Sequence, residues 1–168
     1  MAAIQERFKQ IKTFIFDVDG VLTDGSVNLL ASGERFRTVF IRDTYAIERA
    51  LKAGFRVAIL SSSNSDGVRS WLTATNVKDI FMGGPSDQKV NAYLGYIARD
   101  GLNEAEILYM GDDIPDFTIL SRTDVFSTCP ADAVDEIQSV CTYISPMVGG
   151  RGAVRDVIEQ VMKAQGKW

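Results

Sequence analysis

Short apolar runs alternate with longer amphipathic segments along the chain. The runs at 13–18 (TFIFDV) and 56–61 (RVAILS) have the length and composition of buried β-strands. The segment 87–101 instead places Val90, Tyr93 and Ile97 at helical spacing. The pattern predicts strands at 13–18, 56–61, 78–83, 105–111, 124–128 and 142–145, and helices at 44–54, 65–76, 87–101, 114–122, 131–140 and 152–165.

Strands that alternate with helices predict right-handed βαβ crossovers and a parallel sheet. The predicted strands are apolar on both faces, as a sheet covered on both sides requires. We therefore expect an α/β fold, with a doubly wound, Rossmann-like parallel sheet and helices on both faces. The segments 27–30 and 35–41, with Ser32 and Gly33 at the turn, predict a β-hairpin after the first strand. The length of 168 residues suits one domain, spanning 1–168.

Composition excludes several classes of protein. The chain is 46% hydrophobic, which is enough for a core, and its net charge of −4 argues against a sequence-independent nucleic-acid binder. We expect no membrane partner, because no apolar run approaches the length of a membrane span and residues 1–12 carry charges where a signal peptide is apolar. Cys129 and Cys141 have no metal-binding spacing and read as reduced thiols, so we expect a cytoplasmic protein.

Candidate chemistry gathers where the predicted strands end. In open α/β sheets, ligands bind beyond the carboxyl ends of the strands, so polar residues at those positions are expected to converge. The chain contains no histidine, so acid–base chemistry must come from carboxylates, lysine, tyrosine or cysteine. The residues that follow the strands, or open the next helix, are Asp17, Asp19, Ser61, Ser62, Lys89, Asp112, Asp113 and Asp116.

Carboxylates held together repel one another unless a cation neutralises them. Mg²⁺ suits such a group, because it takes oxygen ligands from one or two carboxylates and from a substrate phosphate. Lys89 and the Ser61 hydroxyl suit phosphate oxygens. Each residue alone has a simpler interpretation: Asp17 and Asp19 as turn residues, and Asp112 or Asp113 as a cap for the helix that Pro115 opens. Their joint position after successive strands favours the site.

The motifs resemble a known superfamily. The segments DVDGVLTDG (17–25) and GDDIPD (111–116), with Ser61 and Lys89 between them, resemble the four motifs of the haloacid dehalogenase superfamily of phosphohydrolases. The hairpin, IRDTYAI (41–47) and the segment 149–167 resemble more closely the 3-deoxy-D-manno-octulosonate 8-phosphate phosphatases. The resemblance implies an Mg²⁺-dependent homotetramer that makes the octulosonate sugar of lipopolysaccharide.

The resemblance also implies a role for each matched position. Asp17 would attack phosphorus and form an aspartyl-phosphate, and Asp19 would protonate the leaving alkoxide and then activate water. Gly20 would let the chain turn sharply after them. Mg²⁺ would be held by Asp17, the Asp19 carbonyl and Asp112. The phosphoryl group would be bound by Ser61, Ser62 and Lys89. Waters or ligands around the metal ion would be oriented by Asp113 and Asp116.

Many relatives in the superfamily carry a cap domain between these motifs, but this chain has room for none. We therefore expect either a large substrate or a neighbouring subunit that covers the site, with the apolar hairpin as the assembly surface. The alternative for the hairpin is packing on its own domain. Arg151, in a glycine-rich segment, either reaches an adjacent site to pair with a substrate carboxylate or lies in a plain helix-entry loop.

The chain departs from the family around the expected substrate. Its second motif contains Ser61 to Asn64 and no arginine, where the octulosonate phosphatases usually have one. Phe40 replaces a common asparagine and Thr44 a common glycine. The candidate substrate contacts are Arg42, Ser63, Arg69 and Arg151.

The expected reaction is hydrolysis of a keto-deoxy sugar acid phosphate, first 3-deoxy-D-manno-octulosonate 8-phosphate, with a nonulosonate 9-phosphate as the alternative. From other classes, a signalling receiver domain would place its phosphorylated aspartate after the third strand rather than the first. Against a catalytically silent interaction module on the same fold, every core catalytic residue type is present here; loss of turnover with intact Mg²⁺ binding would favour such a module.

Overall fold

The central sheet has six parallel strands in the order β5-β4-β1-β6-β7-β8. The computed structural model describes residues 2–168. At the centre, Phe16 of β1 pairs with Ile59 of β4 on one side and with Met110 of β6 on the other. The strands are β1 (Thr13–Phe16), β4 (Arg56–Ser61), β5 (Asp79–Met82), β6 (Ile107–Met110), β7 (Phe126–Cys129) and β8 (Tyr143–Ile144).

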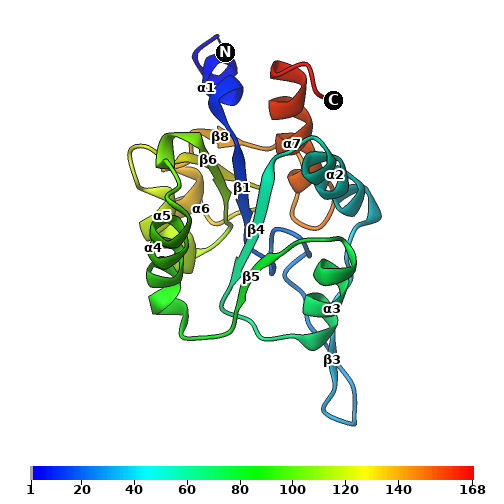
Figure 1. Ribbon diagram of the computed structural model, residues 1–168. Helices are drawn as coiled ribbons and strands as arrows, with labels where there is room; N and C mark the ends of the chain where they lie inside the picture. Colours follow the sequence, from blue (N-terminus) through cyan, green and yellow to red (C-terminus); the bar gives the residue numbers. More distant parts are fainter. Residues whose placement is uncertain (1) are drawn as a thin grey trace.

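Helices cover both faces of the sheet (Figure 1). Neighbouring side chains of β1 point to opposite faces: Phe14 and Phe16 belong to one core cluster, and Ile15 belongs to the other. One face packs on α1 (Ala2–Gln10), α2 (Ile41–Lys52), α3 (Asp66–Ala74) and α7 (Ala153–Ala164), and the other on α4 (Lys89–Asp100), α5 (Phe117–Leu120) and α6 (Asp135–Gln138). The expected doubly wound α/β fold is therefore confirmed.

The strand order reverses between β1 and β6. From β1 the chain adds β4 and then β5 on one side, and it then returns to place β6 on the other side of β1. The carboxyl ends of β1 and β6 therefore flank the switch point, which is where open α/β sheets bind ligands. Asp17 follows the first of these strands, and Asp112 follows the second after one glycine.

The hairpin predicted after the first strand is present but shorter than expected. It consists of β2 (Asn28–Leu29) and β3 (Arg35–Phe36), which pair antiparallel, and it projects from the body of the molecule (Figure 1). The predicted strand 35–41 is wrong beyond Phe36, because helix α2 already begins at Ile41 rather than at Thr44. Aromatic and β-branched residues at 38–41 favoured a strand, but their backbone has no partner strand.

Two other elements differ most from the sequence expectation. Helix α1 was not predicted; its apolar side chain Phe8 packs into the core beside α7. The predicted helix 131–140 is reduced to Asp135–Gln138, because residues 131–134 form a turn. The 3₁₀ turns η1 (Ser86–Gln88), η2 (Glu104–Glu106) and η3 (Ile114–Asp116) complete the described elements.

No cap domain lies over the carboxyl edge of the sheet within residues 2–168. Between Asp17 and Ser61 the chain forms the hairpin and α2, and between Ser61 and Lys89 it forms α3, β5 and η1. The ends of β1, β4 and β6 are therefore left open to a substrate or to another molecule. None of the helices in this part of the chain has the length and apolar character needed to cross a membrane.

Candidate active site

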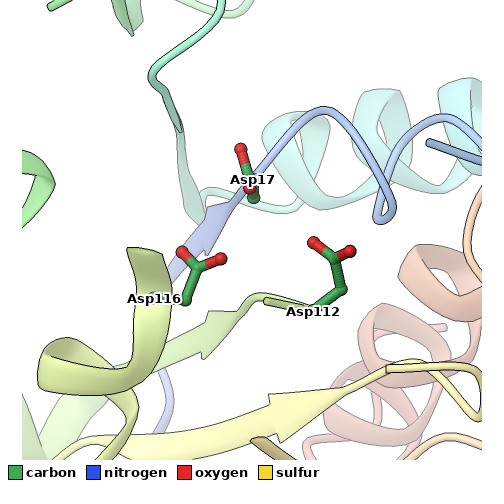
Figure 2. Close-up of side chains that lie close together, drawn as sticks. All are labelled: Asp17, Asp112 and Asp116. Atoms are coloured by element: carbon green, nitrogen blue, oxygen red, sulfur yellow. The ribbon is translucent and has the colours of Figure 1, made fainter. Parts of the chain in front are cut away.

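Three carboxylates converge at the switch point of the sheet. Asp17, Asp112 and Asp116 each offer an oxygen, and these oxygens all lie within 4.8 Å of one another. Figure 2 shows the three side chains gathered around one space, with Asp17 beyond β1 and Asp112 beyond β6. Two glycines make this approach possible. A Cβ at Gly20 would lie 1.9 Å from Asp112 Oδ2, and one at Gly111 would lie 2.3 Å from Asp116 Cγ.

Lys89 bridges two of these carboxylates. Its Nζ lies 2.7 Å from Asp17 Oδ2 and 2.7 Å from Asp116 Oδ1, and only 3% of its side chain is exposed. The Tyr109 hydroxyl donates a hydrogen bond to the same Asp116 oxygen, and burial raises the pKa of Tyr109 well above its usual value, which keeps this donor protonated. Lys89 is the first residue of α4, and its ion pairs with Asp17 and Asp116 hold the ammonium group in place.

One ammonium group does not balance three carboxylates. Burial, reinforced by the charge of Asp116, raises the pKa of Asp17 to about 7. Burial and the charge of Asp17 raise the pKa of Asp112 to about 8. Burial alone would lower the pKa of Lys89, but the charges of Asp116 and Asp17 outweigh it and raise that pKa. The cluster therefore favours added positive charge.

The donor set fits a hard divalent cation. All three side chains offer oxygen, the ligand atom that Mg²⁺ prefers. Asp116 Oδ2 is buried and has no hydrogen-bond partner within residues 2–168. The structure places Asp116 beside Asp17 and Asp112, where it can bind the metal ion directly. The resemblance instead implied that Asp116 orients waters or ligands around the ion. Its contacts with Lys89 and Tyr109 are compatible with either role.

The serines of the second motif lie beside the carboxylates. Ser61, Ser62 and Ser63 line, with the aspartates and Lys89, a hollow of about 260 Å³ that we call the acidic pocket. The Ser62 hydroxyl is buried and has no hydrogen-bond partner in the described chain, so it is available to a ligand oxygen. The acidic pocket is lined by Asp17, Asp19, Gly25, Ser61, Ser62, Ser63, Lys89, Asp112, Asp113, Pro115 and Asp116.

Asp113 serves as the cap that the sequence allowed. Its Oδ1 accepts a hydrogen bond from the Ile114 N–H at 2.8 Å, at the start of η3, and its carboxylate is not part of the three-residue cluster. Asp113 therefore fixes the turn that brings Asp116 back toward the end of β6. Its role in orienting waters or ligands stays a prediction.

Asp19 is held apart from the three clustered carboxylates. The Arg37 guanidinium donates from Nε to Asp19 Oδ1, and from Nη2 to Asp19 Oδ2 at 3.0 Å. Arg37 Nη2 also donates to Ser63 Oγ at 2.8 Å. Sequence reasoning missed Arg37, because the contact joins residues 18 apart through a loop of irregular backbone. One indication of this contact was present in the sequence, which is that Arg37 lies in the predicted hairpin segment that follows the first motif.

The four candidate substrate contacts fall into two groups. Ser63 lines the acidic pocket, and Arg69 lines an adjoining hollow of about 490 Å³ that shares Ser61, Ser62 and Lys89 with it. Arg42 and Arg151 line a separate hollow of about 400 Å³, beside Phe40 and Met147. Within one chain these two arginines are not brought into the acidic pocket, and their contact with a substrate stays a prediction.

Asp43 connects α2 to the glycine-rich segment before α7. Its two oxygens accept hydrogen bonds from the Gly152 N–H at 3.2 Å and from the Arg155 N–H at 2.8 Å, which caps the start of α7. The segment before α7 then packs on the loop after β1, where the Gly150 N–H donates to the Val21 carbonyl at 2.8 Å. The sequence resemblance at 41–47 and 149–167 thus corresponds to one packed unit beside the acidic pocket.

The chain is similar to characterised phosphatases over nearly its whole length. It is 30% identical over 164 residues to the 3-deoxy-D-manno-octulosonate 8-phosphate phosphatase of Haemophilus influenzae, covering 98% of this chain and 89% of that protein. It is 29% identical over 166 residues to the Escherichia coli phosphatase of the same name, covering 99% of this chain and 87% of that protein. No family model matches the chain.

Solved structures agree with this likeness. The phosphatase of that name from Moraxella catarrhalis, in complex with a magnesium ion, a phosphate ion and 3-deoxy-D-manno-octulosonate (KDO), superposes with a TM-score of 0.93 at 29% identity, over 99% of this chain and 94% of that one. A protein from Legionella pneumophila, described as a subfamily III A hydrolase of the haloacid dehalogenase superfamily, gives a TM-score of 0.94 at 28% identity, over 99% and 90% of the two chains.

Proposed function

Because the chain belongs to the 3-deoxy-D-manno-octulosonate 8-phosphate phosphatase family, within the capless branch of the haloacid dehalogenase superfamily, we propose that it hydrolyses the phosphate monoester of a keto-deoxy sugar acid. The first candidate substrate is 3-deoxy-D-manno-octulosonate 8-phosphate. The observation that carries this proposal is the cluster of Asp17, Asp112 and Asp116, bridged by Lys89 at the switch point. We take residues 1–168 as one cytoplasmic phosphatase domain.

A magnesium ion in this proposal is held by Asp17, Asp112 and the Asp19 carbonyl, with Asp113 and Asp116 orienting waters or ligands around it. The ion supplies positive charge that offsets the repulsion between the carboxylates and a phosphate dianion. The support is the oxygen-only donor set, the raised pKa values of Asp17 and Asp112, and the relative from M. catarrhalis that contains magnesium and phosphate.

The chemistry then follows from the side chains. Asp17 attacks phosphorus, the bond from phosphorus to the sugar oxygen breaks, and Asp19 donates a proton to the departing oxygen. In the second step a water oxygen attacks phosphorus and loses a proton to Asp19, and the bond to Asp17 breaks, which restores its carboxylate. Lys89 lies against Asp17 and bonds the phosphoryl oxygens together with Ser61 and Ser62.

Assembly completes the proposal. A site with no cap excludes water poorly, so a neighbouring subunit is proposed to cover it, in a homotetramer. The support is the hairpin, which leaves Leu29 72% exposed and Phe36 49% exposed. In such an assembly Arg42 and Arg151 would face a neighbour's substrate carboxylate. Analytical ultracentrifugation of Leu29→Glu tests this: the proposal expects the tetramer to dissociate.

The function itself is tested by comparing kcat/KM for octulosonate 8-phosphate, nonulosonate 9-phosphates and simple hexose phosphates, with Mg²⁺ and with chelator. Asp17→Asn is the control, because it keeps the shape of the side chain and removes the nucleophile. Preference for the eight-carbon acid supports the first candidate. Preference for a nonulosonate would make the neutral Ser63 and its neighbours a specificity switch. Absence of Mg²⁺-dependent turnover on all of them would overturn the proposal in favour of a silent interaction module.

A further inference from the structure

Arg37, the residue that follows the hairpin, contacts Asp19 and Ser63, which both line the acidic pocket. Only 8% of its side chain is exposed, whereas Phe36 and Thr38 on either side are exposed. It lies directly after β3, so its side chain joins the projecting hairpin to the loop after β1. A buried arginine needs partners for its donors, and Arg37 has them in Asp19 and Ser63.

The contact with Asp19 fixes the orientation of the carboxylate. Nε and Nη2 of Arg37 each donate to a different oxygen of Asp19, which is the fork geometry that arginine forms and lysine does not. The Thr23 hydroxyl adds a longer contact of 3.4 Å to Asp19 Oδ1. Both oxygens of Asp19 therefore have partners, and this carboxylate lines the acidic pocket together with Asp17, Asp112 and Asp116.

We propose that Arg37 is the positioning residue for Asp19 and that it acts mainly in the second half of the reaction. This inference rests on the proposed function. A fork of two N–H groups to both oxygens holds the Asp19 carboxylate in one orientation, which a group that accepts a proton from an attacking water requires. In that step the water oxygen bonds to phosphorus, its proton passes to Asp19, and the electrons of the breaking bond return to the Asp17 carboxylate. Arg37 thus holds the base ready while Asp17 carries the phosphoryl group.

The assignment also gives the hairpin a direct link to the chemistry. Ser63, which takes the third donor contact of Arg37, belongs to the second motif, where the arginine usual in the family is absent. Arg37 therefore supplies a guanidinium group beside the second motif from a different part of the chain.

The test uses 4-nitrophenyl phosphate with saturating Mg²⁺, because its leaving group needs no proton from Asp19. Wild type is compared with Arg37→Met, with Arg37→Lys, and with Arg35→Met as a matched control from the exposed part of the same hairpin. We expect Arg37→Met to lower kcat at least about tenfold and to lower KM in proportion, with kcat/KM unchanged, because only the step that follows phosphorylation of Asp17 is slowed. The steady-state fraction of protein phosphorylated on Asp17, measured after quenching, should rise. Arg37→Lys should recover part of the loss, and Arg35→Met should match wild type.

Three outcomes would overturn the assignment. A fall in kcat with no rise in phosphorylated protein would give Arg37 a merely structural role, and an increase in KM alone would make it a substrate ligand. Equal losses in Arg35→Met would assign the effect to the hairpin as a whole. All three outcomes require an active wild-type protein. They are therefore distinct from failure of the proposed function, in which the wild-type protein itself would show no Mg²⁺-dependent turnover. In that case the role assigned to Arg37 would be refuted as well.

Discussion

Replacing Lys89 by methionine should destabilise the metal-free protein strongly at high pH. Within residues 2–168, Lys89 is the basic side chain that forms ion pairs with the clustered carboxylates, and both contacts are 2.7 Å. Methionine keeps most of the side-chain volume and removes the charge. The packing around the start of α4 is therefore largely preserved, and the loss reports on electrostatics.

The size of the effect follows from burial. Breaking a buried ion pair by removing one partner typically costs about 3–5 kcal/mol. We expect about 3 kcal/mol at pH 8, since Asp17 and Asp112 can relieve part of the repulsion by binding protons. For a protein of this length, that corresponds to a decrease in Tm of about 6–12 °C.

The pH dependence has a definite sign. The folded pKa values of Asp17 and Asp112, about 7 and about 8, lie above the value of 3.8 for a solvated aspartate. Folded protein therefore binds more protons than unfolded protein between about pH 4 and pH 8, and metal-free stability falls as the pH rises through this window. At pH 5.5 both carboxyl groups are largely protonated, so the cost of Lys89→Met should shrink to about 1 kcal/mol.

The assay is thermal and urea unfolding with chelator at pH 5.5 and pH 8. Lys163→Met is the matched control, because the Lys163 side chain is 57% exposed and pairs with Glu159 on the surface, where such a pair contributes about 0.5 kcal/mol or less. A loss below about 1 kcal/mol for Lys89→Met at pH 8, or an equal loss at the two pH values, would refute the electrostatic reasoning.

Three further predictions concern the metal and the packing beside it. Gly20→Ala should weaken Mg²⁺ binding at least about tenfold, measured by calorimetry, because the added Cβ would overlap the Asp112 carboxylate. Gly33→Ala is the control and should leave Mg²⁺ binding unchanged, because Gly33 has nearly the same φ (+84° against +83°) and open space around it. Mg²⁺ at about 100 times its Kd should stabilise wild type by about 2.7 kcal/mol in thermal unfolding. Asp135→Asn, at an exposed carboxylate outside the acidic pocket, should be stabilised equally, and Asp112→Asn should not; equal shifts in all three would contradict the ligand assignment. Asp43→Ala should lose about 2 kcal/mol in urea unfolding, because the start of α7 loses its cap; a loss below about 0.5 kcal/mol would contradict it.

The sequence predicted the sheet and the gathering of acids because both follow from topology. Strands that are apolar on both faces must be covered on both sides, and residues that end successive parallel strands must meet at one edge. Asp17, Ser61 and Asp112 came together for this reason, and so did Lys89 at the start of α4.

Other features depend on contacts that no local pattern encodes. The fork from Arg37 to Asp19 joins an irregular segment to a loop, and the cap from Asp43 to α7 spans more than a hundred residues of sequence. Helix α1 has only nine residues, too few for an isolated helix to be stable, so its formation depends on packing of side chains such as Phe8. Tertiary packing decided these features, and the sequence carried only weak signs of them.

The most direct test of the account is to ask whether Asp17 becomes phosphorylated. The protein would be mixed with octulosonate 8-phosphate and Mg²⁺ and quenched during turnover. The acyl phosphate would then be reduced with borohydride, and the modified residue located by mass spectrometry. The account predicts modification at Asp17, and neither modification nor turnover in Asp17→Asn. Modification of a different residue, or turnover by Asp17→Asn at the wild-type rate, would contradict it.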